Sequence, residues 1–407
     1  MRHARPRPPA PRARRLTGIA AFCAAVLLAA PAWADDDDPP PAPLALHLRE
    51  TLDLWRNTRG GLQVGDTQLN KLQLVADFNG THLGLPGWTA RLQYFRANGE
   101  RLSGGRIGDV QTASNIEALS TDRLMEAWVA RRFGRGDLKA GLIDLNAEFD
   151  SIGAAGLFLN SSHGIGPDLS KSGLDGPSIF PVSAPGAQAR WRPSKRLSLA
   201  AAAFGGTPGD LAHPKAFAAA RLSARDGALL IGQANWSLGE DARVALGAWR
   251  YTASFDRLDR PDLRQHGWAG TYAFVEGPLP VEHVKGWLRA GLTDRGVATV
   301  SDYLGGGLTR EAPFASRPDD AIGLAVGRAG LGGPARRAAG LPAAETTVEL
   351  TYRYQLSHAL AVQPDLQYVR HPASRAGLPD ALAVGLRLSF GLDRTFGAPA
   401  DAPGPTR

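Results

Sequence analysis

The feature that most restricts the fold of this chain is a two-residue alternation of apolar and polar side chains. From Glu345 to Leu356, for example, Thr, Val, Leu and Tyr alternate with Glu, Thr, Arg and Gln. Successive side chains of a β-strand point to opposite faces, so the pattern indicates strands with one apolar and one polar face. Sixteen such strands are predicted, near residues 44–55, 70–79, 88–96, 123–133, 138–144, 186–192, 196–205, 228–237, 241–251, 266–276, 284–292, 301–309, 321–329, 345–356, 359–369 and 381–390.

These segments favour a membrane barrel over a soluble β protein. Most have a length close to the roughly 9–11 residues that a tilted strand needs to cross a bilayer. Their number is even, and short links alternate with long ones, as in bacterial outer-membrane barrels. A soluble barrel would need an apolar interior, whereas one face of each strand here is polar. We therefore expect an all-β, 16-stranded antiparallel transmembrane β-barrel with its apolar face toward lipid and its polar face toward a water-filled lumen.

The N-terminus has the features of an export signal. The formal net charge is +7, but six arginines lie between Arg2 and Arg15; without them 40 basic residues face 39 acidic ones, which argues against nucleic-acid binding. The apolar stretch Leu16–Ala30 is too short for a membrane-spanning helix and is followed by Ala32-Trp33-Ala34. We predict a signal peptide over 1–34. The only cysteine, Cys23, lies inside it, so the mature chain has no thiol or disulfide chemistry.

The rest of the chain divides into three parts. Residues 35–43, four aspartates and a proline-rich stretch, are predicted to be a solvated lead-in. Residues 44–390 form the predicted barrel, and 391–407 a flexible tail. Outer-membrane barrels usually end on an aromatic residue, and the sequence leaves two alternatives: either Phe396 ends the last strand in a slipped register, or the tail follows Phe390 into the periplasm.

The polar parity of the strands gives candidate pore-lining residues. Charges of both signs occur there, without the ring of one sign expected for strong ion selectivity. Arginine, acidic and glutamine side chains suit sugar hydroxyls, and an inward Trp128 suits the C–H face of a sugar. The strand candidates are Arg49, Asp53, Lys71, Gln73, Asp77, Arg91, Gln93, Glu126, Trp128, Arg132, Glu349, Arg353, Asp365 and Arg387.

Two further groups of residues have expected places. The longest connection, Leu145 to Pro185, is expected to fold into the lumen and set its narrowest width, because loops this long are usually functional; a surface loop is the alternative. Aromatic residues near strand ends are expected in two interfacial girdles. They are Trp55, Trp88, Tyr94, Trp191, Trp236, Trp249, Tyr251, Trp268, Tyr272, Trp287 and Tyr368.

The sequence has no strong enzymatic signature. HExxH, GxxxxGK[ST] and GxSxG motifs do not occur, and the nine histidines show no ligand spacing. Ser162 and His163 are adjacent, but neighbouring residues rarely form a nucleophile and its base. We expect no catalytic residue, no metal and no cofactor.

Several separated blocks resemble one family. They are GLIDLNAEFDSIGAAGLFLNSSHGIGPDLSKSG at 141–173, PSIFPVSAPGAQARWRP at 177–193, YAFVEGPL at 272–279, YLGGGLT at 303–309, RPDDAIGLAVGRA at 317–329, ETTVELTYRYQL at 345–356 and PDLQYVRHP at 364–372. In this order they resemble the carbohydrate-selective porins of the OprB family, over about residues 44 to 390.

The resemblance implies a sixteen-stranded barrel, passive uptake of sugars such as glucose, and a constriction formed by loops with charged and aromatic side chains. By position it adds Asp144, Asn146, Glu148 and Asp150 as constriction candidates. A general or ion-preferring porin is the alternative, and an outer-membrane lipid hydrolase a weaker third. Expected partners are sugar solutes, outer-membrane lipid and the outer-membrane assembly machinery, with no nucleic acid; a homotrimer is left open.

Overall fold

The computed structural model describes residues 42–218, 222–239, 241–331, 333 and 342–397. The predicted signal peptide, the lead-in up to Pro41 and the last ten residues of the predicted tail lie outside the described residues.

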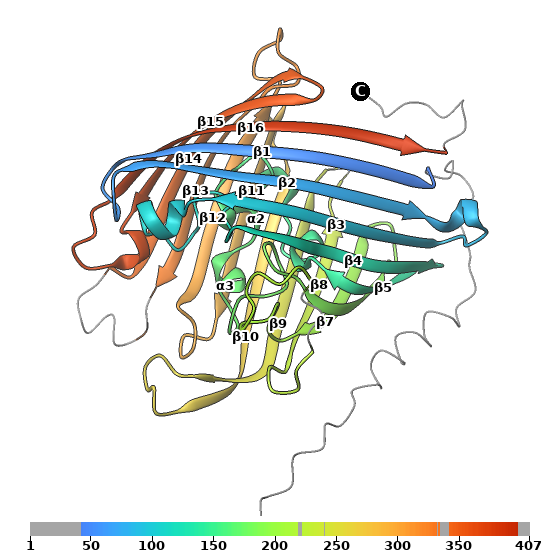
Figure 1. Ribbon diagram of the computed structural model, residues 1–407, viewed down its shortest axis with the longest axis horizontal. Helices are drawn as coiled ribbons and strands as arrows, with labels where there is room; N and C mark the ends of the chain where they lie inside the picture. The colour runs from blue at the N-terminus through green and yellow to red at the C-terminus, as the bar shows by residue number, and fades with distance from the viewer. Residues whose placement is uncertain (1–41, 219–221, 240, 332, 334–341, 398–407) are drawn as a thin grey trace, which may run out of the picture.

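The chain forms one closed antiparallel barrel in which β1 pairs with β16 and every other strand pairs with its neighbours in sequence (Figure 1). Each of the sixteen predicted strands is present, most of them with bounds within a few residues. The strands are β1 Leu44–Arg59, β2 Gly65–Asn79, β3 Trp88–Gly99, β4 Thr121–Phe133, β5 Gly136–Ile143, β6 Ala184–Trp191, β7 Leu197–Gly205, β8 Ala228–Ser237, β9 Arg243–Asp256, β10 Arg264–Pro278, β11 Val284–Thr293, β12 Val300–Glu311, β13 Ala321–Leu331, β14 Ala344–Ser357, β15 Leu360–Arg370 and β16 Ala381–Phe396.

The last strand corrects the predicted barrel end. β16 continues six residues past Phe390 to Phe396, which pairs with Leu44 at the start of β1. The pairing of β16 with β1 is continuous from Thr51 to Leu44, so the ladder needs no slip to reach Phe396. Closing the barrel onto the long β1 requires a partner for each of its residues, and residues 391–396 supply it. The predicted flexible tail therefore began too early.

The outer wall has the expected apolar face. Leu46, Leu54, Leu386 and Leu392 are exposed on adjacent strands, as are the leucines at the same parity around the barrel. Lipid tails can solvate such a surface, whereas water cannot. In the described part of the chain no helix has both the length and the apolar character needed to cross a membrane.

The prediction of aromatic girdles is wrong for six of its eleven residues, which point inward. Trp191 and Trp236 are exposed on the outer wall as expected, and Trp88, Tyr94 and Tyr368 share the outward parity. The other six point inward, because their parity places them on the opposite face of their strands. Those buried inward aromatics are Trp55, Trp249, Tyr251, Trp268, Tyr272 and Trp287.

The inward aromatics are covered by segments between strands. Two connections at the same end of the barrel, residues 100–120 and 144–183, turn back and contain many buried side chains. The lumen is thus only partly open, as expected from a longest connection that folds into it. Short helices in the connections are η1 Gly80–Leu83, η2 Ser103–Ile107, η3 Leu145–Ala147, η4 Gly153–Ala155, α2 Ser161–Gly164, α3 Pro167–Ser170 and η5 Pro372–Ser374.

Candidate permeation site

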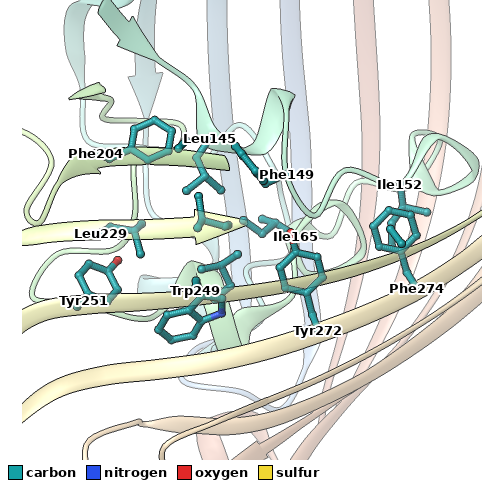
Figure 2. Close-up of a cluster of buried hydrophobic side chains, with 14 of the residues drawn as sticks. Leu145, Phe149, Ile152, Ile165, Phe204, Leu229, Trp249, Tyr251, Tyr272 and Phe274 are labelled. Atoms are coloured by element: carbon teal, nitrogen blue, oxygen red, sulfur yellow. The ribbon is translucent and has the colours of Figure 1, made fainter. Parts of the chain in front are cut away.

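The longest loop, residues 144–183, packs against one side of the barrel wall. Figure 2 shows Leu145, Phe149, Ile152 and Ile165 of the loop among inward side chains of β7 to β10. Phe149 is fully buried, and the wall side chains that it joins include Leu229, Trp249, Tyr251, Tyr272 and Phe274. Burying such side chains is favourable by roughly 1.5–3 kcal/mol each. The apolar contact accounts for the fold of this loop into the lumen.

A buried arginine fixes the middle of the same loop. Arg289 on β11 is 1% exposed and donates to Asp150 through Nε at 3.1 Å and Nη2 at 2.7 Å. It also donates to both carboxylate oxygens of Asp168. The rings of Tyr272 and Tyr303 lie 5.4 Å from its guanidinium carbon. A buried guanidinium is tolerated only when its donors are satisfied, and here the loop supplies the acceptors.

Wall glutamates accept hydrogen bonds from the loop backbone. Glu276 on β10 accepts from the amide of Ala154 at 2.7 Å. Glu349 on β14 accepts from the amides of Leu159 at 2.6 Å and Asn160 at 3.0 Å. Charge-assisted bonds of this kind are about twice as strong as neutral ones. These carboxylates stabilise loop backbone that has no strand partner.

The loop of residues 100–120 is held in the same way on the adjacent wall. Glu345 on β14 accepts from the amides of Val110 at 2.9 Å and Gln111 at 3.1 Å. Ser114 donates at 2.7 Å to Asp53 of β1, which Arg387 of β16 holds with bonds of 2.6 and 2.8 Å. Side chains of both loops also pack against β1 to β4, as Phe180 does against Phe95 and Met125.

The inner wall of β1 to β6 carries a row of alternating charges. His47 on β1 lies 3.5 Å from Asp77 on β2, which accepts from Arg91 on β3 at 2.6 Å. Arg91 lies 3.6 Å from Glu126 on β4. Glu126 in turn accepts from the indole N–H of Trp128 at 2.9 Å.

The row continues from Trp128 to β6. Lys139 on β5 lies 4.2 Å from the centre of the Trp128 ring and pairs with Glu148 of the long loop. Glu148 also accepts from Arg190 on β6. Burial alone would raise the pKa of Glu148, but Lys139 and Arg190 hold that pKa below its usual value, so the residue stays ionised. We call this row the charged belt: His47, Asp77, Arg91, Glu126, Trp128, Lys139, Glu148 and Arg190.

Two hollows open on either side of the long loop. One of about 680 Å³ is lined by both inner loops and includes Asp144, Asn146 and Phe158. The other, of about 1240 Å³, is lined at the opposite end by strand connections and includes Arg132 and Arg353. Gly156 lines both, so the tip of the long loop separates them.

The two hollows differ in charge. Five acidic and three basic side chains line the hollow beside the loops, whereas three acidic and eight basic ones line the other. Asp144 is one of the acidic residues of the loop hollow. Burial, with the charge of Glu126, raises the pKa of Asp144 to about 7, although Lys71 opposes this. The charge of this carboxyl therefore changes near neutral pH.

Some of the predicted pore residues belong to the charged belt on the inner wall. Arg91, Glu126, Trp128 and Glu148 are in the charged belt, as is Asp77. Asp144 and Asn146 line the loop hollow, whereas Arg132 and Arg353 line the opposite hollow. Arg49 pairs with Asp393 near the end of β16. Lys71 lies 4.8 Å from the ring of Phe180, facing the loop, and Gln73 and Gln93 are partly exposed on the inward face.

The structure assigns other predicted residues to loop anchoring. Asp53, Asp150 and Glu349 are fully buried, and Asp365 and Arg387 are nearly so. Their partners are other wall or loop groups, so a solute in the open lumen does not reach them. Inward parity alone could not distinguish them from belt residues, because both are charged and both face the axis.

Sequence reasoning missed several residues of the site. Lys139, Arg190 and Arg289 were not singled out, although each has inward parity on a predicted strand. An arginine among the apolar and aromatic inward residues of β11 was the available signal for a buried ion pair. Glu276 and Glu345 gave no sign that they bind backbone amides, which depends on loop conformation.

No group that could hold a metal ion occurs within the described ranges. His163 is buried beside Tyr303 and Glu349, with its Nδ1 atom 3.3 Å from the Tyr303 hydroxyl. Burial lowers the pKa of His163 to about 3, so it stays neutral at ordinary pH. The Ser162 hydroxyl donates to Gln111 instead of to this histidine.

Comparison with known proteins identifies one family. The model of the family "Carbohydrate-selective porin, OprB family" matches residues 64–392. No curated protein sequence gave a significant match.

Solved structures with the same fold include several porins. The high-pH structure of Pseudomonas putida OprB superposes with a TM-score of 0.75 at 19% identity, covering 86% of this chain and 94% of that chain. The low-pH structure of the same protein superposes with a TM-score of 0.56 at 17% identity, covering 86% of this chain and 93% of that chain. Salmonella typhi OmpF, in complex with daunomycin, superposes with a TM-score of 0.58 at 11% identity, covering 86% of this chain and 98% of that chain. At these identities the likeness shows the barrel fold alone.

Proposed function

Because the chain belongs to the carbohydrate-selective porin (OprB) family, we propose that it lets glucose-like monosaccharides and small oligosaccharides diffuse passively across the outer membrane into the periplasm. The family match establishes an outer-membrane channel and a carbohydrate-selective class. The preference for small glucose-like solutes is the proposal.

One observation carries it: the charged belt crosses the inner wall of β1 to β6, with Asp77 and Arg91 partly exposed, and includes an indole. Arg91 and Glu126 supply donors and acceptors for sugar hydroxyls, and Trp128 lies between Glu126 and Lys139. Their mutual pairing leaves no strong excess of either sign. Such a surface can exchange hydrogen bonds with a neutral polyol without holding one ion type.

Liposome swelling tests the proposal. We expect vesicles with the purified protein to swell faster in glucose than in disaccharides, and faster than protein-free vesicles in both. Swelling equal to that of protein-free vesicles would refute it.

The alternative of a general or ion-preferring porin makes a different prediction. In planar bilayers it would show strong cation or anion selectivity that added glucose does not change, whereas a sugar-preferring channel shows conductance that falls as glucose occupies the lumen. Homotrimer formation and recognition of Phe396 by the assembly machinery stay predictions.

A further inference from the structure

The hollow at one mouth of the barrel has a strong excess of positive charge. Eight of its lining side chains are basic and three are acidic, around a volume of about 1240 Å³. It is bounded by the short connections β4–β5, β6–β7 and β8–β9, which lie at the end of the barrel where β1 begins and β16 ends. Bacterial outer-membrane barrels have their short turns on the periplasmic side, so this is the periplasmic mouth.

Most of these cations have no carboxylate partner. Three of the eight are in ion pairs, as Arg243 is with Glu276 at 2.7 Å. The other five have no ion-pair partner in the part of the chain that the structure describes; they are Arg132, Arg135, Lys195, Arg196 and Arg353. Their charges are therefore available to a solute in the hollow.

Arg353 also has an unsatisfied donor. It lies on β14 with the same inward parity as Glu349, and its Nε atom is buried without a hydrogen-bond acceptor among the described residues. A buried guanidinium N–H without an acceptor is unfavourable. An anion bound in the hollow can supply that acceptor.

The unpaired cations act together on a solute. Successive connections at this mouth are two strand spacings, about 10 Å, apart, and the Debye length at 0.1 M ionic strength is also about 10 Å. A cleft lined by one sign of charge concentrates ions of the opposite sign. Guanidinium groups in particular suit a carboxylate, whose two oxygens accept a pair of N–H groups. The hollow therefore favours solutes that carry a carboxylate.

Neutral hydrogen-bonding groups lie beside these cations. Ser198 on β7 pairs in register with Asn235 on β8, and both line the hollow. Asn235 accepts through Oδ1 from Arg243 at 3.2 Å, which leaves its amide N–H groups as donors for a solute. Arg196 precedes Ser198 by two residues and so has the same parity. Cations beside a hydroxyl and an amide match a sugar that carries an acid group better than a small inorganic anion.

We propose that this basic hollow binds carboxylate-bearing sugars such as uronates at the periplasmic mouth, so that acidic as well as neutral sugars are solutes of the channel. Lys195 and Arg196 bind the carboxylate, and Ser198 and Asn235 bind ring hydroxyls. The inference rests on the proposed sugar-channel function and adds a charged class of sugar to it. The hollow at the opposite mouth offers no comparable site, because its five acidic side chains outnumber three basic ones.

Conductance titration with matched solutes tests the charge preference. Single channels of the purified full chain are titrated on both sides with sodium glucuronate, with glucose, and with glucuronamide, in which an uncharged amide replaces the carboxylate. In KCl of about 0.1 M we expect glucuronate to block at about one-tenth of the glucuronamide concentration, the factor that one charge-assisted contact of about 1.4 kcal/mol gives. In KCl of about 1 M, where the Debye length is about 3 Å, the two should block at equal concentrations.

Variants at the mouth test the location. Lys195→Gln with Arg196→Gln should raise the half-blocking concentration of glucuronate to that of glucuronamide. The matched control, Arg101→Gln with Arg260→Gln, removes two exposed cations at the opposite mouth and should keep the wild-type block by glucuronate. Heat-dependent mobility in detergent gels verifies that each barrel is folded.

The outcomes separate this inference from the proposed function. Absence of any block by glucose in the wild type would refute the sugar channel itself. Block by glucose, with equal block by glucuronate and glucuronamide at low salt, would overturn only the acidic-sugar site, as would an unchanged glucuronate block in the folded mouth variant. Relief of the glucuronate block by an equal concentration of sodium acetate would indicate a general anion site and would also overturn it.

Discussion

The two sides of the lumen are built from the same kind of strand but differ in their inward side chains. Along β7 to β11 the inward side chains are mostly aromatic or apolar, and the long loop covers them. Along β1 to β6 the inward side chains include the charged belt, in which the side chains of His47, Asp77 and Arg91 are about one-third exposed. The path of a solute therefore follows from which inward faces a loop can bury.

The comparison separates two roles for charge inside one barrel. On the packed side Arg289 is 1% exposed, and its ion-pair partners Asp150 and Asp168 both belong to the long loop. On the open side the Arg91 side chain is one-third exposed to solvent and pairs with Asp77 and Glu126. The first kind of charge should govern where the loop lies, and the second what passes.

The largest effect is expected from Arg289→Ala. It leaves Asp150 and Asp168 buried without a counter-charge, and breaking a buried pair in this way costs about 3–5 kcal/mol. We expect the long loop to detach, the pore to conduct more, and sugars larger than disaccharides to enter. Conductance and liposome swelling measure this, and heat-dependent mobility in detergent gels verifies that the barrel is folded. Wild-type conductance in the folded variant would show that the ion pair does not hold the loop.

A smaller effect on the same side is expected from Glu349→Gln. The amide replaces one of two carboxylate oxygens that accept from Leu159 and Asn160, at a cost of about 1–3 kcal/mol. Amide hydrogen exchange should become faster in residues 153–164 while strand amides stay protected. Exchange that is unchanged there would mean that apolar packing alone holds the loop tip.

A tryptophan on each side gives a matched pair. Trp128→Ala removes the belt indole and should weaken glucose block of conductance by at most about tenfold, since a ring contact is worth about 0.5–1.5 kcal/mol. Trp249→Ala, on the packed side, should loosen the loop and leave little specific effect on glucose affinity. Titration of conductance with glucose distinguishes the two variants. If glucose block of conductance weakened equally in both, the proposed difference in role between the open and the packed side would be wrong.

The smallest effect is a pH response of the loop hollow. The pKa of Asp144 is raised to about 7, so this carboxyl is mostly charged at pH 8 and neutral at pH 6. Lowering the pH across this range removes one negative charge, and the reversal potential in a KCl gradient should shift toward anion preference. In the wild type the Asp144 carboxylate accepts from the Asn146 amide at 2.9 Å. Asp144→Asn keeps an oxygen acceptor for this amide but carries no titrating charge, so it should abolish the shift in reversal potential. A shift of equal size in this variant would assign the response to other groups.

The sequence predicted the barrel well because its signal is local. Alternation along each segment determines which side chains face lipid, and Leu350 and Glu349 lie on the faces that parity assigned to them. What covers an inward face depends on contacts between distant segments, such as that of Phe149 with Tyr272. This is why Trp249 and Trp287 were assigned to girdles, and why Glu349 was grouped with Arg91 as a pore residue.

The most direct test of the account compares the accessibility of two inward positions. The predicted mature chain has no cysteine, so Gln73→Cys on the open side and Ala245→Cys on the packed side each introduce a single thiol. A charged, membrane-impermeant thiol reagent should react with Cys at 73 and reduce conductance, and should leave Cys at 245 unmodified in the folded protein. Rapid modification at 245 with protection at 73 would contradict the placement of the pore.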